Sequence, residues 1–289
     1  MFDKVAIVGV GLLGGSLARE LRAQDLCQTI IGVCRSDLTA NTALSENIVD
    51  TVLPLSEAVR EAELIVFATP MQSMVPLLKE VASNIPTGSI ITDVGSVKTH
   101  LYSQLCEQCP QVLSQFVLAH PIAGGENSGV GAAQLNLFSG KNVIITDTQE
   151  VSAEATDKVK SMWLSVGANV INMSLQEHDA IFAKTSHLPH VVAFSLVNFL
   201  SAQPDNERLF RLAAAGFYDF TRIASSDAEM WRDICVTNKE EVLKALDGFR
   251  DQIDEIRLNV DEGDQQAILD YFGAAKAARN AGLHKKKKP

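Results

Sequence analysis

The sequence has no hydrophobic run long enough to cross a membrane and no N-terminal signal segment. The apolar stretch VVAFSLVNFL falls short of the roughly 18 residues that a membrane span requires, so we expect a buried helix there and no membrane partner. Met1 leads directly into the strand-like KVAIVGV, without the charged, apolar and small-residue regions of a signal peptide. These features predict a cytoplasmic protein.

An excess of positive charge and a cysteine framework are also missing. The formal net charge is −10, which argues against nucleic-acid binding because such binding needs a basic face. An anionic substrate therefore requires a local cluster of cations, since the overall field repels it. Cys106 and Cys109 form an isolated CxxC pair, which is typical of reduced thiols. His187 and His190 have no evident third ligand, so we expect no metal site.

The 289 residues suit two domains of ordinary size. Up to residue 172, short apolar and β-branched runs alternate with helix-compatible segments. The strand-like runs are VAIVGV, TIIGVC, LIVFAT, SIITDVG, FVLAHP, NVIITD and ANVINM. This alternation predicts an α/β fold for residues 1–172, with a Rossmann-like, doubly wound and mostly parallel sheet that binds a dinucleotide.

Beyond residue 172 the pattern changes to long helical periodicities without a convincing strand. Apolar residues recur every three or four positions in HDAIFAKTSHLPHVVAFSLVNFL and NKEEVLKALDGFRDQIDEIRLNV, as in helices that pack on helices. We therefore expect an all-α second domain over residues 173–289. Its last residues, HKKKKP, are a run of like charges at a chain end, which is typical of a disordered basic tail.

A glycine-rich loop follows the first strand-like run and precedes a helical segment. Gly9, Gly11 and Gly14 form G-x-G-x-x-G, with Leu12 and Leu13 in the variable positions. Gly9 permits a tight turn, Gly11 lets the backbone approach a pyrophosphate, and Gly14 allows the helix to pack closely on its strand. The helix then presents free N–H groups to the phosphates. Since the strand and helix that the motif requires are present, we expect a dinucleotide cofactor.

The end of the second strand bears on the choice between NAD and NADP. NAD enzymes usually place an acidic residue there, about 20 positions beyond the glycines, to bind the ribose 2′-hydroxyl. This chain has Arg35 and Ser36, which suit a 2′-phosphate better, although Asp37 follows them. We therefore expect NADP or dual specificity. Thr69 and Pro70, at the end of LIVFAT, are assigned to the same cofactor site.

Further segments carry dense polar residues inside apolar surroundings. Two of them, DVGSVK and HPIAGGENSG, follow strands, and the carboxyl ends of strands in an open α/β sheet face the ligand crevice. We therefore expect both loops to point at the nicotinamide. The other two, TSHLPH and GFYDFTRIASSDAEMWRDI, lie in the helical region.

Together, GVGLLGGSLA, DVGSVK, HPIAGGENSG, TSHLPH and GFYDFTRIASSDAEMWRDI resemble, in order and spacing, the motif set of prephenate and arogenate (cyclohexadienyl) dehydrogenases. The resemblance extends to about Tyr271. It implies an oxidoreductase of tyrosine biosynthesis that uses NAD(P) to oxidise and decarboxylate a cyclohexadienyl ring. The family dimerises through its helical domain, and the extensive apolar helix faces of this chain agree with a homodimer.

The resemblance also implies roles for individual residues. His120 is the catalytic base that withdraws the 4-hydroxyl proton as hydride leaves, and an imidazole suits this because its pKa lies near working pH. Ser96 shares the hydroxyl hydrogen-bond network and helps to orient the histidine. Arg222 binds a substrate carboxylate, for which a planar two-pronged donor has the right shape.

Other positions match substrate-binding positions of the family. Ser186 and His190 are four residues apart, so they can share one helix face that points at the substrate. Glu126 and Asp219 match gating or polar positions around it, and Trp231 matches an aromatic lining position.

Several alternatives remain open. Tyr218 stands where relatives often have a basic residue, which leaves open how the side-chain carboxylate of the substrate is held. His120 and Trp231 also suit purely structural roles, and Arg222 lies within helical reach of Asp219 for an ion pair. One alternative function is a β-hydroxyacid dehydrogenase or imine reductase, although those enzymes usually rely on a lysine in the interdomain helix. The other is a nucleotide-binding redox sensor without catalysis. No residue plainly selects prephenate over arogenate.

Overall fold

The computed structural model describes residues 2–125 and 127–286. The chain forms two compact units, Met1–Lys239 and Glu240–Pro289. The boundary predicted at 172/173 falls inside the first unit, at the end of its last strand. Within the described residues, none of the helices combines the length and apolar character needed to span a membrane.

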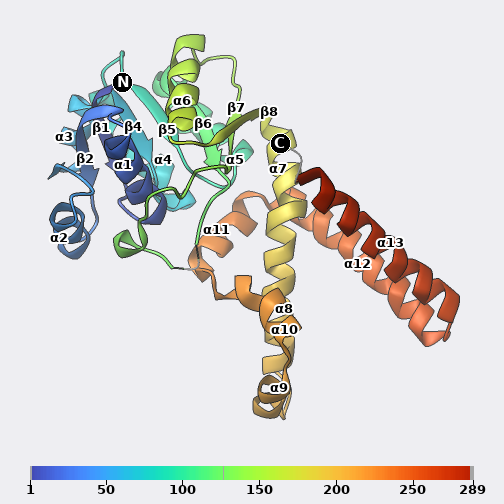
Figure 1. Cartoon of the computed structure of the whole chain (residues 1–289). Helices are drawn as coiled ribbons and strands as arrows, with labels where there is room; N and C mark the ends of the chain where they lie inside the picture. The colour runs from blue at the N-terminus through green and yellow to red at the C-terminus, as the bar shows by residue number, and fades with distance from the viewer. Residues whose placement is uncertain (1, 126, 287–289) are drawn as a thin grey trace. The chain divides into compact units, whose positions relative to one another are not determined.

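An eight-stranded sheet forms the centre of the first unit (Figure 1), with the order β3-β2-β1-β4-β5-β6-β7-β8. The strands are β1 (Phe2–Val8), β2 (Cys27–Val33), β3 (Thr51–Val52), β4 (Leu64–Phe67), β5 (Ile90–Asp93), β6 (Phe116–Pro121), β7 (Asn142–Thr146) and β8 (Asn169–Met173). β1 to β6 are parallel, whereas β7 runs antiparallel to β6 and parallel to β8. The predicted α/β fold and all seven predicted strands are confirmed, and the sequence missed only the two-residue β3.

Helices cover both faces of this sheet. One hydrophobic core contains side chains of α1 (Leu12–Ala23), α2 (Asp37–Ser45) and α6 (Ala153–Ser165). The other contains side chains of α3 (Leu55–Glu61), α4 (Met71–Val81) and α5 (Thr99–Gln108). β1 shows why its sequence is continuously apolar, because Val5 and Ile7 face the first core while Ala6 and Val8 face the second.

The strand order brings the polar loops to one edge of the sheet. β1 lies between β2 and β4, so the chain first adds strands on one side of β1 and then continues on the other side. Because β1, β4, β5 and β6 are parallel, their carboxyl ends meet at the same edge. The glycine-rich turn, Thr69, the loop 94–98 and His120 lie at these ends, which is where ligands bind in doubly wound sheets.

The rest of the first unit is helical. α7 (Leu175–Phe182) begins at Ser174, whose Oγ accepts a hydrogen bond from Glu177 N at 3.2 Å. The chain continues without a break through a π-helical turn, η4 (Ala183–His187), into α8 (Leu188–Ser201). The remaining helices are α9 (Asn206–Leu212), α10 (Ala215–Thr221) and α11 (Ala228–Thr237), and the short 3-10 segments are η1 (Ala82–Asn84), η2 (Pro110–Gln115), η3 (Val130–Ala132) and η5 (Arg222–Ser225).

The second unit is a helical hairpin in which α12 (Lys239–Asp261) and α13 (Gln265–Lys286) lie side by side (Figure 1). Gly263, with φ +67°, lies in the turn between them. The sequence predicted a disordered tail from residue 284, but α13 continues to Lys286, consistent with the strong helix formers Ala, Lys and Arg that precede it. Residues 287–289 lie outside the described residues.

Candidate active site

The three glycines of the glycine-rich turn differ in the space beside them, which is open at Gly11 and filled at Gly9 and Gly14. A Cβ on Gly9 would lie 2.7 Å from the carbonyl oxygen of Ala68, and Gly9 has φ +98°. A Cβ on Gly14 would lie 2.3 Å from the carbonyl oxygen of Gly9. A Cβ on Gly11 would meet no protein atom within 4 Å. Gly9 and Gly14 are therefore required by packing, whereas the space beside Gly11 is open.

The surroundings of this turn fit a dinucleotide. α1 begins at Gly11 without a side-chain cap and without an acidic residue in its first turn, so its N-terminus can receive a phosphate. Leu12 and Leu13 pack partly against the first core. Thr69 lies beside Gly9, and its Oγ1 is buried without a hydrogen-bond partner in the structure. A buried hydroxyl of this kind is normally paired, so a cofactor atom is a suitable partner. Pro70 is exposed and precedes the first residue of α4.

Arg35 and Ser36 follow β2, as the predicted ribose site requires. Ser36 is the N-cap of α2, and its Oγ accepts a hydrogen bond from Thr39 N at 3.3 Å. Arg35 is exposed, and Asp37 lies in the first turn of α2. The Ser36 hydroxyl therefore already serves as a helix cap, and the exposed Arg35 guanidinium lies next to it.

His120 lies near the carboxyl end of β6 and is 9% exposed. Its ring packs edge-on against Phe182, with 5.1 Å between the ring centroids. Burial, and then the nearby His178, Lys98 and His187, hold the pKa of His120 well below its ordinary value. The ring is therefore neutral near pH 7 and has a free lone pair, but its pKa lies below the near-neutral value that was expected from the sequence.

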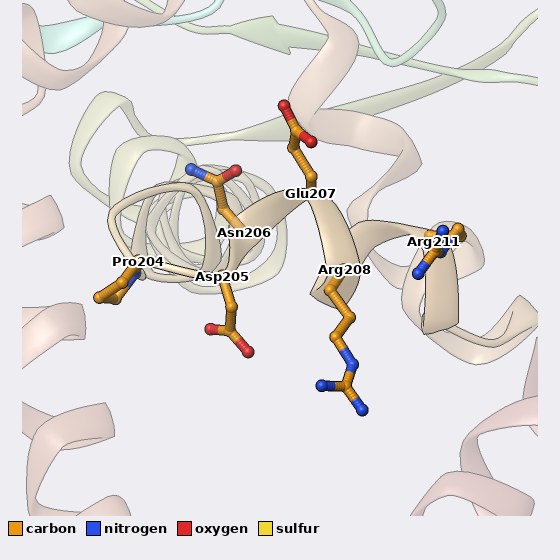
Figure 2. Close-up of a pocket in the computed structure, with 6 residues that line it drawn as sticks. All are labelled: Pro204, Asp205, Asn206, Glu207, Arg208 and Arg211. Carbon is orange, nitrogen blue, oxygen red and sulfur yellow. The ribbon is translucent and has the colours of Figure 1, made fainter.

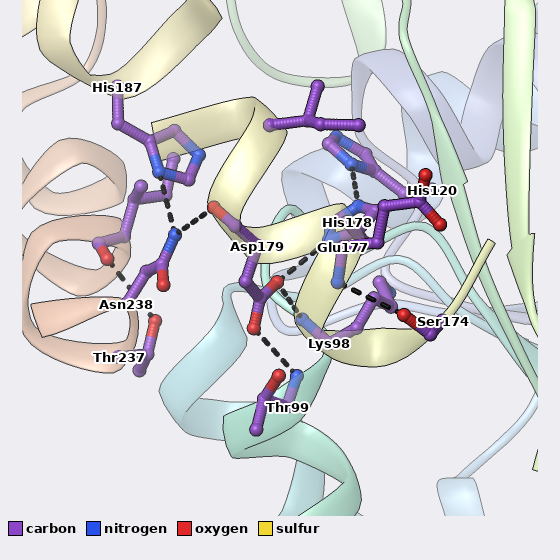
Figure 3. A network of polar contacts seen from close by, with 12 residues as sticks. Lys98, Thr99, His120, Ser174, Glu177, His178, Asp179, His187, Thr237 and Asn238 are labelled. Carbon is purple, nitrogen blue, oxygen red and sulfur yellow. Dashed lines mark hydrogen bonds and ion pairs between the residues drawn. The ribbon is translucent and has the colours of Figure 1, made fainter. Parts of the chain in front are cut away.

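The hydrogen-bond partner of His120 comes from α7 (Figure 3). His120 Nδ1 and His178 Nε2 are 2.8 Å apart, and His178 Nδ1 lies 2.7 Å from Asp179 Oδ1. Asp179 Oδ1 also accepts from Lys98 N at 2.9 Å, and Asp179 Oδ2 accepts from Thr99 N at 2.8 Å. The sequence analysis missed both His178 and Asp179, because they stand in a segment interpreted only for its helical periodicity.

A second buried pair holds the backbone next to His120. The ammonium of Lys98, 0% exposed, donates to Asp93 Oδ2 and, at 2.7 Å, to the carbonyl oxygen of Ala119. Ala119 N donates to Asp93 Oδ1 at 3.0 Å. Burial lowers the pKa of Lys98, and the Asp93 carboxylate opposes this effect. The pair therefore clamps the peptide that precedes the predicted base.

Ser96, which was expected to help orient His120, lies in the loop between Asp93 and Lys98 and is half-buried. Among the described residues no hydrogen bond joins Ser96 to His120, whose Nδ1 instead lies 2.8 Å from His178 Nε2. The next residue, Val97, forms a small apolar cluster with Trp231 and Ile234 of α11. The loop after β5 is thus packed against the helical part of the same unit.

Three of the predicted substrate residues lie together on the helical side. The rings of His190 and Trp231 are stacked, with 3.7 Å between their centroids, and His190 Nδ1 donates to the carbonyl oxygen of Ser186 at 2.9 Å. Trp231 is 8% exposed, and its Nε1 is buried without a hydrogen-bond partner in the structure. Burial lowers the pKa of His190, as does the nearby Arg222 guanidinium. Arg222 is exposed at the start of η5, which packs against α8.

The remaining predicted positions are less closely connected. Asp219 is exposed on α10, and the Tyr218 hydroxyl donates to the carbonyl oxygen of Phe210 at 2.7 Å. Glu126 lies outside the described residues. His187 is buried, with its Nδ1 3.2 Å from Asn238 Nδ2. Within residues 2–125 and 127–286, no group of His, Cys, Asp or Glu is arranged to hold a metal ion.

A surface hollow of about 450 Å³ lies at the start of α9 (Figure 2). It is lined by Pro204, Asp205, Asn206, Glu207, Arg208 and Arg211. None of these is a predicted site residue. Because α9 has only seven residues and the hollow is open to solvent, we assign it no role in binding.

Comparison with known proteins agrees with the motifs. The family "Prephenate dehydrogenase, nucleotide-binding domain" matches residues 17–172, and "Prephenate dehydrogenase, dimerization domain" matches residues 174–274. The prephenate dehydrogenase of Bacillus subtilis (strain 168) is 37% identical, over 97% of this chain and 76% of that protein. The cyclohexadienyl dehydrogenase of Zymomonas mobilis is 32% identical, over 97% of this chain and 96% of that protein.

A solved structure is similar over nearly its whole length. The prephenate dehydrogenase of A. aeolicus, in complex with hydroxyphenyl propionate and NAD+, superimposes with a TM-score of 0.91 at 34% identity. The match covers 97% of this chain and 98% of that one. Motifs, fold and sequence identity thus agree over both the sheet and the helical part, and the chain belongs to the prephenate dehydrogenase family of NAD-dependent oxidoreductases.

Proposed function

We propose that this protein catalyses the oxidative decarboxylation of prephenate to 4-hydroxyphenylpyruvate, or of arogenate to tyrosine, in tyrosine biosynthesis. One observation carries the proposal. A buried, neutral histidine, His120, lies at the same edge of the sheet as a glycine-rich turn with open space at Gly11. A dehydrogenase of a cyclohexadienyl alcohol needs this pairing of a base with a dinucleotide site.

His120 acts as the base at the substrate hydroxyl. The bound nicotinamide supplies the chemistry of hydride acceptance, and the chain's own residues manage the proton. His120 Nδ1 is engaged by His178, so Nε2 is the atom that takes the proton of the 4-hydroxyl. The electrons of the C1–carboxylate bond then enter the ring as CO2 leaves, and Nε2 returns the proton to the phenolate oxygen. Aromatisation supplies much of the driving force, so the protein chiefly positions the ring.

The helical residues bind the ring and its carboxylates. Arg222 suits a carboxylate, and it lies close enough to His190 to influence its pKa. The stacked His190 and Trp231 rings offer an apolar wall with one unpaired N–H, from Trp231 Nε1. Ser186 lies one helical turn before His190. Glu126 and Asp219 are proposed as polar positions around the substrate, and Ser96 as a partner of its hydroxyl.

Several observations support the proposed cofactor. Gly9, Gly11 and Gly14 form the proposed phosphate turn, Leu12 and Leu13 start α1, and Thr69 and Pro70 lie between β4 and α4. The A. aeolicus relative was solved with NAD+, which supports use of NAD here. Its other ligand, hydroxyphenyl propionate, has the aromatic ring that this reaction generates. The exposed Arg35 supports use of NADP as well, through an ion pair with a 2′-phosphate.

We also propose that two copies associate through the helical domain, taken as residues 173–289. The matched family domain is described as a dimerization domain. In the second unit, Leu258, Leu269 and Phe272 are more than 45% exposed, so the hairpin leaves apolar surface for a partner copy. An enzyme of this activity is expected in the cytoplasm and has no need of nucleic acid.

Initial rates test the proposal. Prephenate and arogenate are each assayed with NAD and NADP, using the wild type, His120→Asn and the control His100→Asn, which changes an exposed histidine of α5. We expect turnover of at least one substrate, a loss on the order of 10²–10⁴-fold in kcat for His120→Asn, and no loss for the control. Nucleotide binding without turnover of either substrate would favour a redox sensor instead.

A further inference from the structure

The chain of hydrogen bonds behind His120 extends beyond the His178 contact to a buried carboxylate. It passes from His120 Nδ1 to His178 Nε2 over 2.8 Å, and from His178 Nδ1 to Asp179 Oδ1 over 2.7 Å (Figure 3). His178 is 0% exposed and Asp179 is 3% exposed. The two residues are neighbours on α7, whereas His120 is on β6, so the contact depends on the packing of α7 against the sheet.

The contacts of Asp179 decide where the protons lie. The backbone N–H groups of Lys98 and Thr99 donate to its two oxygens, at 2.9 Å and 2.8 Å. Burial alone would raise the pKa of Asp179, but the hydrogen bonds from His178, Lys98 and Thr99 together lower it. Asp179 is therefore an ionised carboxylate, and a carboxylate only accepts hydrogen bonds.

The ionised Asp179 carboxylate determines the tautomer of His178, and His178 in turn determines that of His120. His178 Nδ1 must carry a proton, because it faces the Asp179 carboxylate at hydrogen-bond distance. Burial lowers the pKa of His178 more than the Asp179 hydrogen bond raises it, so the ring is neutral and its Nε2 has a lone pair. That lone pair accepts from His120 Nδ1, which leaves the lone pair of His120 on Nε2.

We propose that His178 and Asp179 are positioning residues that hold His120 in its Nδ1–H tautomer, with Nε2 free to take the substrate proton. The inference rests on the proposed function of His120 as the base. Neither residue touches the reacting atoms. When the hydroxyl O–H bond breaks and the Nε2–H bond forms, the Nδ1 proton stays in place, and the Asp179 carboxylate stabilises the new imidazolium through His178.

The remaining charged groups around His120 support this arrangement. The cation of Lys98 is paired with Asp93, and both hold the backbone of Ala119. The edge-on ring of Phe182 packs against both His120 and His178, with centroids 5.1 and 4.7 Å away. His187 lies on the same helical stretch, and its Nδ1 is bonded to Asn238, whose amide also donates to the backbone carbonyl oxygen of Asp179 at 3.0 Å. Backbone, ring face and Nδ1 of the base are thus each held by a different contact.

The first test compares His178→Leu with His178→Gln. Leucine removes the acceptor, whereas the glutamine carbonyl can still accept from His120 Nδ1. We expect kcat of His178→Leu to fall on the order of 10²-fold or more, because much of the benefit of a positioned base is lost. KM and nucleotide affinity should stay within about threefold, and His178→Gln should recover most of kcat. A kcat of His178→Leu within threefold of wild type would overturn the proposal.

A second measurement reads the tautomer without turnover. Histidine ¹⁵N chemical shifts at pH 7, recorded on the uniformly labelled free protein, should show His120 protonated at Nδ1 and unprotonated at Nε2. His178→Leu should disturb this state, whereas the control His100→Asn, which changes an exposed histidine of α5, should not. A protonated Nε2 in wild type would overturn the inference even if prephenate is turned over. Failure of turnover with the expected tautomer would instead refute the proposed function.

Discussion

Gly11 and Gly14 lie three residues apart, at the N-cap and in the first turn of α1, yet the structure predicts opposite consequences for a methyl group at each. In Gly14→Ala the new Cβ would lie 2.3 Å from the carbonyl oxygen of Gly9 and 2.9 Å from Ile7 Cγ2, so α1 and β1 must separate. Because the closest atom is a backbone oxygen, the cost lies at the top of the usual range for overpacking, about 3 kcal/mol. Alanine gains about 1 kcal/mol over glycine as a helix former. The net expectation is a loss of about 2 kcal/mol of unfolding free energy.

In Gly11→Ala the new Cβ meets no protein atom within 4 Å, and the backbone is extended, with φ −104°. The folded protein should therefore be unchanged or stabilised by about 0.4–1 kcal/mol, because the unfolded chain loses freedom. If a pyrophosphate occupies the open space, the methyl group displaces it. We expect the Kd of the dinucleotide to rise about tenfold or more, equivalent to about 1.4 kcal/mol.

Urea unfolding and calorimetric titration with NAD separate the two effects. Gly88→Ala is the matched control, because its Cβ also meets open space and it lies at the opposite end of β5 from the site. It should change neither quantity. The reasoning fails if Gly11→Ala binds the dinucleotide like wild type, or if Gly14→Ala unfolds at the wild-type urea concentration.

Three further predictions concern buried and exposed charges. Burial lowers the pKa of His187 from 6.5 to about 4, so between these pH values the unfolded chain binds a proton that the folded chain does not. The unfolding free energy should therefore fall by about 3 kcal/mol as the pH falls from 6.5 to 4. His187→Gln should flatten the slope of unfolding free energy against pH, and an unchanged slope would contradict this cause. Arg35→Ala should raise KM for NADP about tenfold and leave KM for NAD unchanged in steady-state assays, unless the 2′-phosphate is held elsewhere. Lys98→Met should cost about 3–5 kcal/mol in urea unfolding by leaving the Asp93 carboxylate unpaired, and Lys98→Met/Asp93→Asn should recover part of this loss.

The sheet was predictable because its strands are buried on both faces. Strands such as β4 (Leu64–Phe67) are apolar at every position, and turns or helical segments separate them, so each run stands out in the sequence. β3 escaped because two residues, Thr51 and Val52, have no periodicity. The disordered basic tail stays a prediction, since α13 ends at Lys286 and residues 287–289 lie outside the described residues.

The site was predictable only where a motif fixes it. The glycine turn and His120 lie in short segments whose residues are close in sequence. The partner of His120 is 58 residues away, and no local pattern connects the two. Lys98 was visible in the sequence, but lysines are almost always exposed, so nothing indicated a residue that is 0% exposed and bound to the backbone beside His120.

The contacts of the proposed base, His120, also indicate that the nucleotide-binding sheet alone does not suffice for the proposed chemistry. The sheet and its loops supply His120 and, through Asp93 and Lys98, a rigid backbone for it. They supply no partner for Nδ1, and without one a neutral imidazole exchanges freely between its two tautomers, only one of which leaves Nε2 basic. That partner, His178, arrives with α7, whose Asp179 accepts hydrogen bonds from the start of α5. On the proposed mechanism, the packing that joins the helical segment to the sheet therefore also selects the reactive tautomer of His120.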